Sequence, residues 1–156
     1  MNADLENKVV LVTGGAGGIG SVISKSFAEQ GAKVIVHYNH SKEKAKKIAK
    51  EIGGIAVYAD LTNSEQSEEV FNHIIDKEGK IDICIANAGK YPKDYAPLWE
   101  IEKKRWENTI STNLSLTYNT SRYFLKHAAE TKNGSLVLIG STAGIYGEAG
   151  HADYAA

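Results

Sequence analysis

The sequence predicts an α/β protein in which helices cover both faces of a doubly wound parallel sheet. Short apolar runs alternate along the chain with amphipathic helical patterns. The runs are apolar without interruption, which is typical of strands buried on both faces. Right-handed crossovers through the intervening helices then build a parallel sheet with helices on both sides. A ligand is expected at the carboxyl ends of the strands, where the strand order reverses.

Five apolar runs are expected to form the strands. They cover residues 9–12, 33–38, 55–59, 82–86 and 135–140. The first helix opens in a glycine-rich turn and is expected to bury Val22, Ile23 and Phe27. It ends at Gly31, because glycine readily adopts the left-handed conformation that closes a helix. The second helix is expected over residues 41–52.

Two further helices are expected in the second half of the chain. The third begins at Thr62, where Glu65 three residues later completes a capping box, and it ends at Gly79. A long fourth helix covers residues 99–130 and carries one stripe of inward-facing side chains. The stripe consists of Trp106, Ile110, Leu114 and Thr117.

The composition limits the class of protein. A chain of 156 residues with 42% hydrophobic and 24% charged residues suits one soluble domain over residues 1–156. A net charge of −1 gives no attraction to nucleic acid or to an anionic membrane, and no apolar run approaches the roughly 20 residues of a membrane span. The N-terminus is unlike a targeting peptide and Cys84 is the only cysteine, so we expect a cytoplasmic protein. Cys84 and the histidines lack metal-ligand spacing, and no metal site is expected.

A glycine-rich turn connects the first apolar run to the first helix, where residues 13–20 read TGGAGGIG. Without side chains, Gly14, Gly18 and Gly20 let the backbone turn sharply and approach a pyrophosphate closely. The helix N-terminus then offers free N–H groups and a positive dipole end to that anion. The alternative interpretation is a tight turn that packs the helix on the strand without a ligand.

Polar and small residues also follow two later strands. Asp60 ends the third strand and leads into Leu61. Its carboxylate can accept a hydrogen bond from an adenine amino group, or it can help Thr62 cap the next helix. Asn87-Ala88-Gly89 follows the fourth strand. Small residues there let the backbone lie against a cofactor, and the amide can connect neighbouring loops, although a plain turn would look the same.

Three polar residues in the second half of the chain are candidates for catalysis. Asn113 lies within the long helix, where asparagine is unfavourable, so a polar role such as binding a water is expected for it. Ser141 follows the fifth strand, and Tyr154 comes 13 residues later, after a glycine-rich loop. Together they can hydrogen-bond a substrate carbonyl oxygen. Taken singly, Asn113 can instead be a simple exposed asparagine, and Tyr154 can instead be a tyrosine that only packs against its neighbours.

Taken together, these motifs resemble the short-chain dehydrogenase/reductase family over essentially the whole chain. Three groups of residues match the family's cofactor motifs. They are Thr13-Gly14 with Gly18-Ile19-Gly20 for the turn, Asp60 for the adenine-side aspartate and Asn87-Ala88-Gly89 for the N-A-G motif. Asn113, Ser141 and Tyr154 fall at the family's catalytic asparagine, serine and tyrosine.

The resemblance implies a Rossmann-type fold, NAD(H) or NADP(H), and reversible hydride transfer between an alcohol and a carbonyl compound. Tyr154 would be the acid or base, and Ser141 would polarise the carbonyl oxygen. A sugar or polyol dehydrogenase and a 3-oxoacyl reductase both remain open. Homo-oligomers, dimers or tetramers, that pack through the long helix are also implied. The alternative is a dinucleotide-binding or sensing module without turnover.

The adenosine end of the expected site favours NADP(H) or dual use. Relatives that prefer NAD place an acid at the end of the second strand, and here Tyr38 holds that position. No carboxylate there would repel a 2′-phosphate, and Ser41 and Lys42 at the next helix start could bind one.

The family's Tyr-x-x-x-Lys motif places its lysine at position 158, beyond the last residue of the sequence, Ala156. That lysine would hold the nicotinamide ribose and lower the pKa of the tyrosine. The chain is therefore expected to be the N-terminal part of a protein of about 250 residues. By itself it is expected to have little or no activity.

Overall fold

A single parallel sheet of five strands organises the structure, a computed structural model that describes residues 4–156. The strands are β1 (Val9–Val12), β2 (Lys33–Tyr38), β3 (Ile55–Tyr58), β4 (Ile83–Ala86) and β5 (Ser135–Leu138). Their order is β3-β2-β1-β4-β5, and every neighbouring pair is parallel. The predicted strands are confirmed, although β3 and β5 end earlier and β4 begins later than expected.

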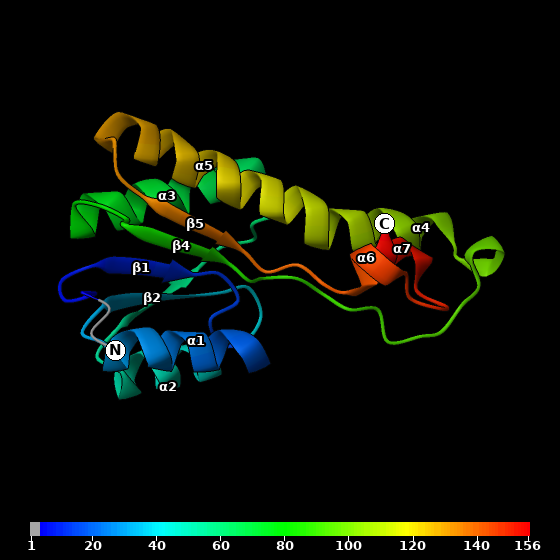
Figure 1. Ribbon diagram of the computed structural model, residues 1–156, viewed down its shortest axis with the longest axis horizontal. Coiled ribbons are helices and arrows are strands. Elements are labelled where there is room, and N and C mark those ends of the chain that lie inside the picture. Colours follow the sequence, from blue (N-terminus) through cyan, green and yellow to red (C-terminus); the bar gives the residue numbers. More distant parts are fainter. Residues whose placement is uncertain (1–3) are drawn as a thin grey trace.

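Helices follow each strand and form two layers around the sheet (Figure 1). The long ones are α1 (Gly18–Glu29), α2 (Lys42–Glu51), α3 (Ser64–Glu78), α4 (Lys103–Ile110) and α5 (Leu116–Thr131). Two short helices, α6 (Ala143–Tyr146) and α7 (Ala152–Ala155), follow β5. Helices α1 and α2 cover one face of the sheet, and α3 and α5 cover the other. The predicted doubly wound α/β fold is confirmed.

Alternate side chains of the central strand enter two separate cores. Val10 and Val12 point toward the side of α2, where they share a cluster with Ile48. Leu11 points to the opposite side and packs in a cluster with Phe71 and Phe124. Because successive strand residues point to opposite faces, a strand with helices on both sides must be apolar throughout. This explains the uninterrupted apolar runs of the central strands. For the edge strand β5 the expected burial on both faces is wrong, because Val137 and Leu138 are exposed.

Two predicted helix details are wrong. Val22 in α1 is 64% exposed, since only the side chains around Ile23 and Phe27 pack on the sheet. The third helix is capped by Asn63, whose side chain accepts from the N–H of Gln66 at 3.0 Å, and not by a box of Thr62 and Glu65. The Thr62 hydroxyl instead donates a hydrogen bond to the Asp60 carboxylate. The N-cap of the helix is therefore one residue later than predicted.

The region of the predicted long fourth helix is divided into four segments. The chain makes a 3₁₀ turn at Leu98–Glu100, then α4, a π-helical segment at Ser111–Ser115, and α5. Trp99 lies in the 3₁₀ turn and is 85% exposed, so it does not start the long helix as expected. Backbone carbonyl oxygens near the π-helical segment accept hydrogen bonds from side chains. For example, the Thr117 hydroxyl donates to the carbonyl oxygen of Asn113 at 2.7 Å. Such bonds compete with regular α-helical pairing.

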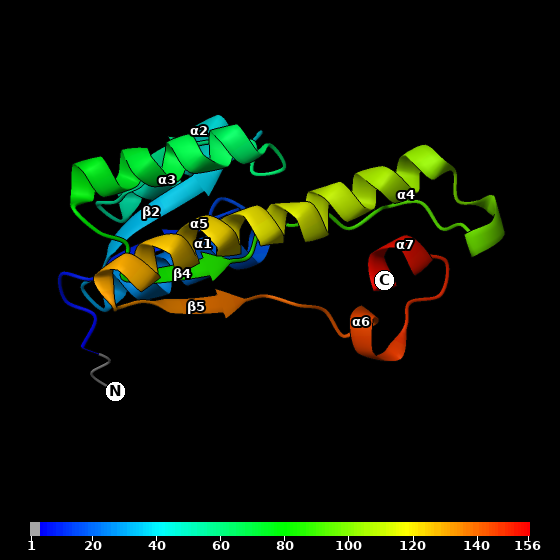
Figure 2. The same ribbon diagram turned by 90° about the horizontal axis from the view of Figure 1, so that it is seen from above.

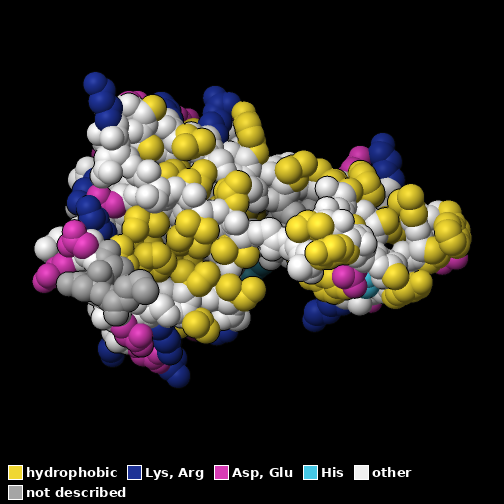
Figure 3. Space-filling view, in the orientation of Figure 1, with side chains coloured by type: hydrophobic (Ala, Val, Ile, Leu, Met, Phe, Trp, Pro, Cys, Tyr) yellow, Lys and Arg dark blue, Asp and Glu magenta, His cyan; other side chains and the backbone are white. Residues whose placement is uncertain are grey.

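Helices α4, α6 and α7 protrude past the carboxyl ends of the strands, as Figures 1 and 2 show. Figure 3 shows hydrophobic side chains gathered on this protrusion and over the part of the sheet layers where Figure 1 draws β5. The exposed side chains include Val137 and Leu138 of β5, an edge strand, and Ile145 and Tyr146 of α6. Within residues 4–156, no helix combines the length and the hydropathy needed to cross a bilayer.

Candidate functional site

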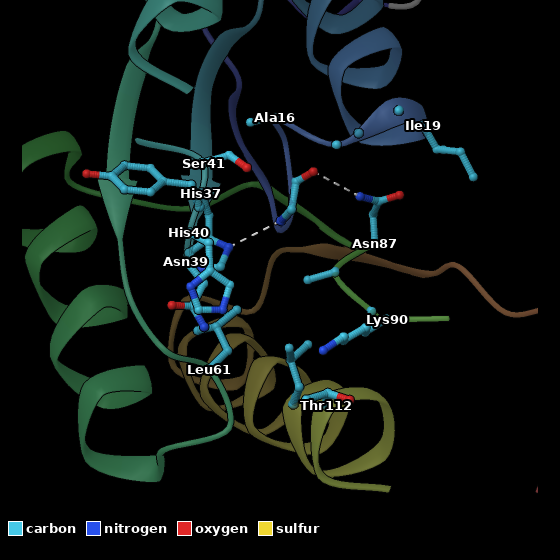
Figure 4. A pocket seen from close by; sticks show the side chains of 18 of the residues that line it. Ala16, Ile19, His37, Asn39, His40, Ser41, Leu61, Asn87, Lys90 and Thr112 are labelled. Atoms are coloured by element: carbon cyan, nitrogen blue, oxygen red, sulfur yellow. Dashed lines mark hydrogen bonds between the residues drawn. The ribbon is translucent and has the colours of Figure 1, made fainter. Parts of the chain in front are cut away.

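A pocket of about 510 Å³ lies at the carboxyl ends of the strands, where the strand order reverses between β1 and β4 (Figure 4). Most of its lining comes from segments that directly follow β1 to β4, and Thr112 and Leu116 complete it from the long helical region. The lining residues predicted from sequence are Gly14, Gly18, Ile19, Gly20, Tyr38, Ser41, Leu61, Asn87, Ala88 and Gly89. A crevice at this point of an open α/β sheet is the usual ligand site.

The start of α1 gives the pocket the properties of an anion site. Among the described residues, no side chain caps this helix. The first N–H groups of a helix have no partner within it, so those of Gly18, Ile19 and Gly20 remain for a ligand. The pocket lining includes Lys90 but no carboxylate within the described part of the chain. A Cβ added to Gly18 would meet no protein atom within 4 Å, because this glycine faces open space.

The other two glycines of the motif are required by close backbone packing. Gly14 has a φ of +62°, and a Cβ there would come within 3.0 Å of the Ala88 Cα. A Cβ on Gly20 would collide with the carbonyl oxygen of Gly14. The two positions therefore fold the turn, whereas Gly18 leaves room beside it. The expectation that all three glycines approach a pyrophosphate stays a prediction.

Thr13 and Asn87 tie the glycine turn to the segment after β4. The Thr13 hydroxyl oxygen accepts from the N–H groups of Asn87 and Ala88, both at 3.0 Å. The Asn87 side-chain amide donates to the carbonyl oxygens of Thr13, at 2.9 Å, and of Gly14, at 3.3 Å. Thr13 is fully buried and does not line the pocket. Its contribution to a cofactor site is thus to hold the turn in place.

His37 is a pocket residue that the sequence interpretation assigned no role. Its Nδ1 accepts from the N–H of Gly14 at 3.2 Å (Figure 4), and its Nε2 lies 3.0 Å from the carbonyl oxygen of Ala59. Because Nδ1 accepts, Nε2 must carry the proton and donate. The ring is 2% exposed, and burial lowers the pKa of His37 from 6.5 to about 4, against smaller opposing effects of Ala59 and Asp60. A neutral imidazole therefore joins β2, the glycine turn and the end of β3.

We expect this histidine to make the fold sensitive to acid. The unfolded chain takes up a proton on His37 near pH 6.5, while the folded chain resists it down to about pH 4. The stability present above pH 6.5 is then lost as the pH falls toward 4, by up to roughly 3 kcal/mol from this group. Urea unfolding of the chain and of His37→Gln between pH 7 and 4 measures the difference. Parallel pH curves for the two proteins would contradict this assignment.

At the expected adenosine end, Tyr38, Ser41 and Leu61 line the pocket, but Asp60 does not. One carboxylate oxygen of Asp60 accepts from both the N–H of Thr62, at 3.0 Å, and its hydroxyl, at 2.7 Å. Asp60 thus bonds to Thr62, but Asn63 and not Thr62 caps the following helix, so the capping alternative is not seen as predicted. A hydrogen bond that an adenine amino group donates to the Asp60 carboxylate stays a prediction.

Asn113 lies in the π-helical segment and holds the chain after β4. Its Oδ1 accepts from the N–H of Lys90 at 2.9 Å, and its Nδ2 donates to the carbonyl oxygens of Lys90, at 3.0 Å, and of Thr109, at 2.9 Å. A Cβ on Gly89 would come within 2.8 Å of the Asn113 Oδ1, so the predicted small residue is needed there. A π-helical turn is often found at a functional site.

Tyr154 and Ser141 both lie in the protruding part of the molecule. Tyr154 is in α7, and its ring stands edge-on to Tyr91, with the ring centroids 5.0 Å apart. Tyr91 also stacks on His151 at 4.6 Å. Ser141 is exposed ahead of α6, and its Oγ accepts from the N–H of Ala143 at 3.2 Å. Their joint action on a carbonyl oxygen stays a prediction.

An ion pair between the partly buried Arg105 and the buried Asp153, next to Tyr154, has no signal in the local sequence. Both carboxylate oxygens of Asp153 accept from the Arg105 guanidinium, from Nε at 2.9 Å and from Nη2 at 3.0 Å. Burial alone would raise the pKa of Asp153, but hydrogen bonds from Arg105 and Thr109 and the Arg105 charge bring that pKa below its ordinary value. The pair fixes α7 against α4.

The fold and this pocket define a dinucleotide-binding type of α/β domain. The model of the short chain dehydrogenase family matches residues 8–156, and the chain belongs to that family. It is 36% identical to the 3-oxoacyl-(acyl-carrier-protein) reductases of Thermotoga maritima and Vibrio cholerae, over 97% and 98% of its own length. It is also 36% identical to an NADP-dependent mannitol dehydrogenase of Alternaria alternata, over 90% of its length. The chain spans 63%, 62% and 55% of these three relatives, respectively.

Proposed function

We propose that this chain is the cofactor-binding part of an NAD(P)-dependent oxidoreductase that interconverts an alcohol and a carbonyl compound. The uncapped start of α1 at the open side of Gly18 carries this proposal, because it presents free N–H groups to a pocket whose lining, among the described residues, includes no carboxylate. Membership of the short chain dehydrogenase family supports it independently. The domain over residues 1–156 would then belong to a longer protein.

The donor set of the pocket fits a dinucleotide. The N–H groups of Gly18 to Gly20 would hold the pyrophosphate, and the small residues Ala88 and Gly89 would lie against the nicotinamide side. When bound, NAD(P) supplies or accepts the hydride. Tyr154 would donate a proton to the substrate oxygen in reduction and remove it in oxidation, while Ser141 would hold that oxygen by a hydrogen bond. A lysine at position 158 would keep the pKa of this tyrosine low.

The names of the relatives support a choice of substrate class, and the exposed side chains of the long helical region support a choice of assembly. Their names include a mannitol dehydrogenase and 3-oxoacyl reductases, which supports a sugar, a polyol or a 3-oxoacyl compound as substrate. We further propose a cytoplasmic homo-oligomer, a dimer or a tetramer. The exposed side chains of Leu114, Tyr118 and Leu125 along the long helical region would form its interface.

A longer chain that continues through a lysine at position 158 tests the function. We expect it to oxidise NADPH with sugars, short ketones or 3-oxoacyl thioesters, with a higher kcat/KM for NADPH than for NADH. The reason is that Tyr38 and Ser41 line the proposed adenosine end of the pocket. Relatives that prefer NAD have an acid at the Tyr38 position, and its charge would repel the 2′-phosphate of NADPH. Lys42→Ala should reduce kcat/KM for NADPH about tenfold and leave NADH nearly unchanged, because one phosphate contact is lost.

The exposed Lys46 in the same helix is the matched control, and Lys46→Ala should change neither value. A clear preference for NADH that Lys42→Ala leaves unchanged would contradict the NADP assignment alone. Tight dinucleotide binding without turnover on the whole substrate panel would contradict the enzyme proposal and favour a sensing module.

A further inference from the structure

One threonine connects the two candidate catalytic segments. The carbonyl oxygen of Thr109 accepts from the Asn113 side chain at 2.9 Å, and the Thr109 hydroxyl donates to the Asp153 carboxylate at 2.8 Å. Asp153 directly precedes Tyr154. Thr109 is 3% exposed and Asp153 is 2% exposed, so the hydrogen bond between them is shielded from water. A single residue of α4 thus bonds to both sides of the proposed catalytic centre.

Arg105, one helical turn before Thr109, extends the same cluster. Besides its two bonds to Asp153, its Nη1 donates to the carbonyl oxygen of Asp94 at 2.7 Å and its Nη2 to that of Gly150 at 3.4 Å. The guanidinium therefore joins α7, the loop that precedes it and the segment after β4. Arginine suits this position because its planar fork presents several donors at fixed angles.

Helix α7 needs such external support. It has four residues, Ala152–Ala155, and a helix of this length has almost no stability of its own. The Tyr154 N–H donates within this turn, to the His151 carbonyl oxygen at 2.9 Å. The direction of the Tyr154 ring is thus set by what anchors α7. The buried carboxylate next to the tyrosine is that anchor.

We propose that Arg105, Thr109 and Asp153 are positioning residues that hold Tyr154 in a fixed relation to Asn113 and to the chain at Lys90. The proposal rests on the proposed function in one respect, the catalytic role of Tyr154. None of the three residues needs to touch the substrate. They act by linking α7 to the π-helical segment, which is itself bonded to Lys90.

The first measurement needs no activity. In the 156-residue chain, hydrogen exchange of the Tyr154 and Ala155 amides reports the opening of α7. Thr109→Val keeps the branched shape but removes the hydroxyl, and we expect these two amides to exchange roughly 10- to 100-fold faster. Thr109→Ser keeps the hydroxyl and should stay within about threefold of the unchanged chain.

The control is Thr120→Val, which removes a buried threonine hydroxyl bonded to the Leu116 carbonyl in α5, away from α7. It should leave exchange at Tyr154 unchanged. In the longer chain with its lysine at 158, Thr109→Val should lower kcat roughly 10- to 100-fold with little change in the KM for NADPH, and Thr109→Ser should restore it.

Unchanged exchange and kcat in Thr109→Val would overturn the proposal. So would a Thr109→Ser variant as defective as Thr109→Val, since the loss would then come from packing. A different pattern isolates the proposed function: if Thr109→Val loosens α7 but Tyr154→Phe remains active, the anchor is confirmed and the catalytic role of Tyr154 is wrong.

Discussion

Gly18→Val should weaken NADPH binding at least about 100-fold, equivalent to about 2.7 kcal/mol, while the protein keeps its stability. A side chain at Gly18 would extend into open space beside the free N–H groups of α1, where the pyrophosphate would lie. The added Cβ would meet no protein atom within 4 Å, so the free energy of unfolding should change by less than about 1 kcal/mol. Titration calorimetry with NADPH and urea unfolding of the 156-residue chain measure the two quantities.

Gly20→Ala is the matched control, because its methyl group would collide with the Gly14 carbonyl oxygen inside the turn. This variant should lose stability, by about 1–3 kcal/mol. The pair separates a glycine kept for a ligand from a glycine kept for the fold. An unchanged NADPH affinity in a folded Gly18→Val protein would contradict the pyrophosphate site and favour the alternative, a tight turn without a ligand.

Tyr154→Phe should lower kcat/KM at least about 1,000-fold in the longer chain that carries a lysine at position 158. Phenylalanine keeps the ring that packs edge-on against Tyr91, so α7 and NADPH binding should be unchanged. Only the hydroxyl that exchanges a proton with the substrate oxygen is removed. The 156-residue chain keeps this hydroxyl but has no lysine to lower the pKa of Tyr154, so it should show little or no turnover.

Steady-state kinetics and NADPH titration of both proteins make the comparison. Tyr58→Phe is the control, since Tyr58 is a half-exposed residue of the edge strand β3 and should tolerate the loss of its hydroxyl. Robust turnover by the 156-residue chain would show that the role assigned to the lysine, or to Tyr154 itself, is wrong.

The fold and the pocket were predictable because their determinants are local. A strand buried on both faces is apolar throughout, and the glycine turn that follows β1 has its whole motif within eight residues, 13–20. The strands that end at this edge then bring their following segments together without further information. The pocket lining at Tyr38, Leu61 and Asn87 follows from this topology.

The features that escaped prediction depend on residues distant in the sequence. His37 looked like an ordinary strand residue, and its partner Gly14 lies 23 positions away. Arg105 and Asp153 are 48 positions apart, and each is flanked by residues typical of a solvated helix or a loop. Helical periodicity also misplaced Val22 and Leu114, both 64% exposed, because the pattern does not say which faces receive a neighbour.

The π-helical segment Ser111–Ser115 connects α4 to α5 and sets the rotation of one helix relative to the other about their common axis. Helix α5 turns its apolar side to the sheet, while α4 turns Arg105 and Thr109 to α7. Each residue of an α-helix rotates the chain by about 100°, so the length of this segment fixes the angle between those two faces. Substitutions here would change individual contacts, but the loss or gain of one residue would turn α4 by about that angle and carry its anchor away from α7. The segment is thus constrained in length more strictly than in composition.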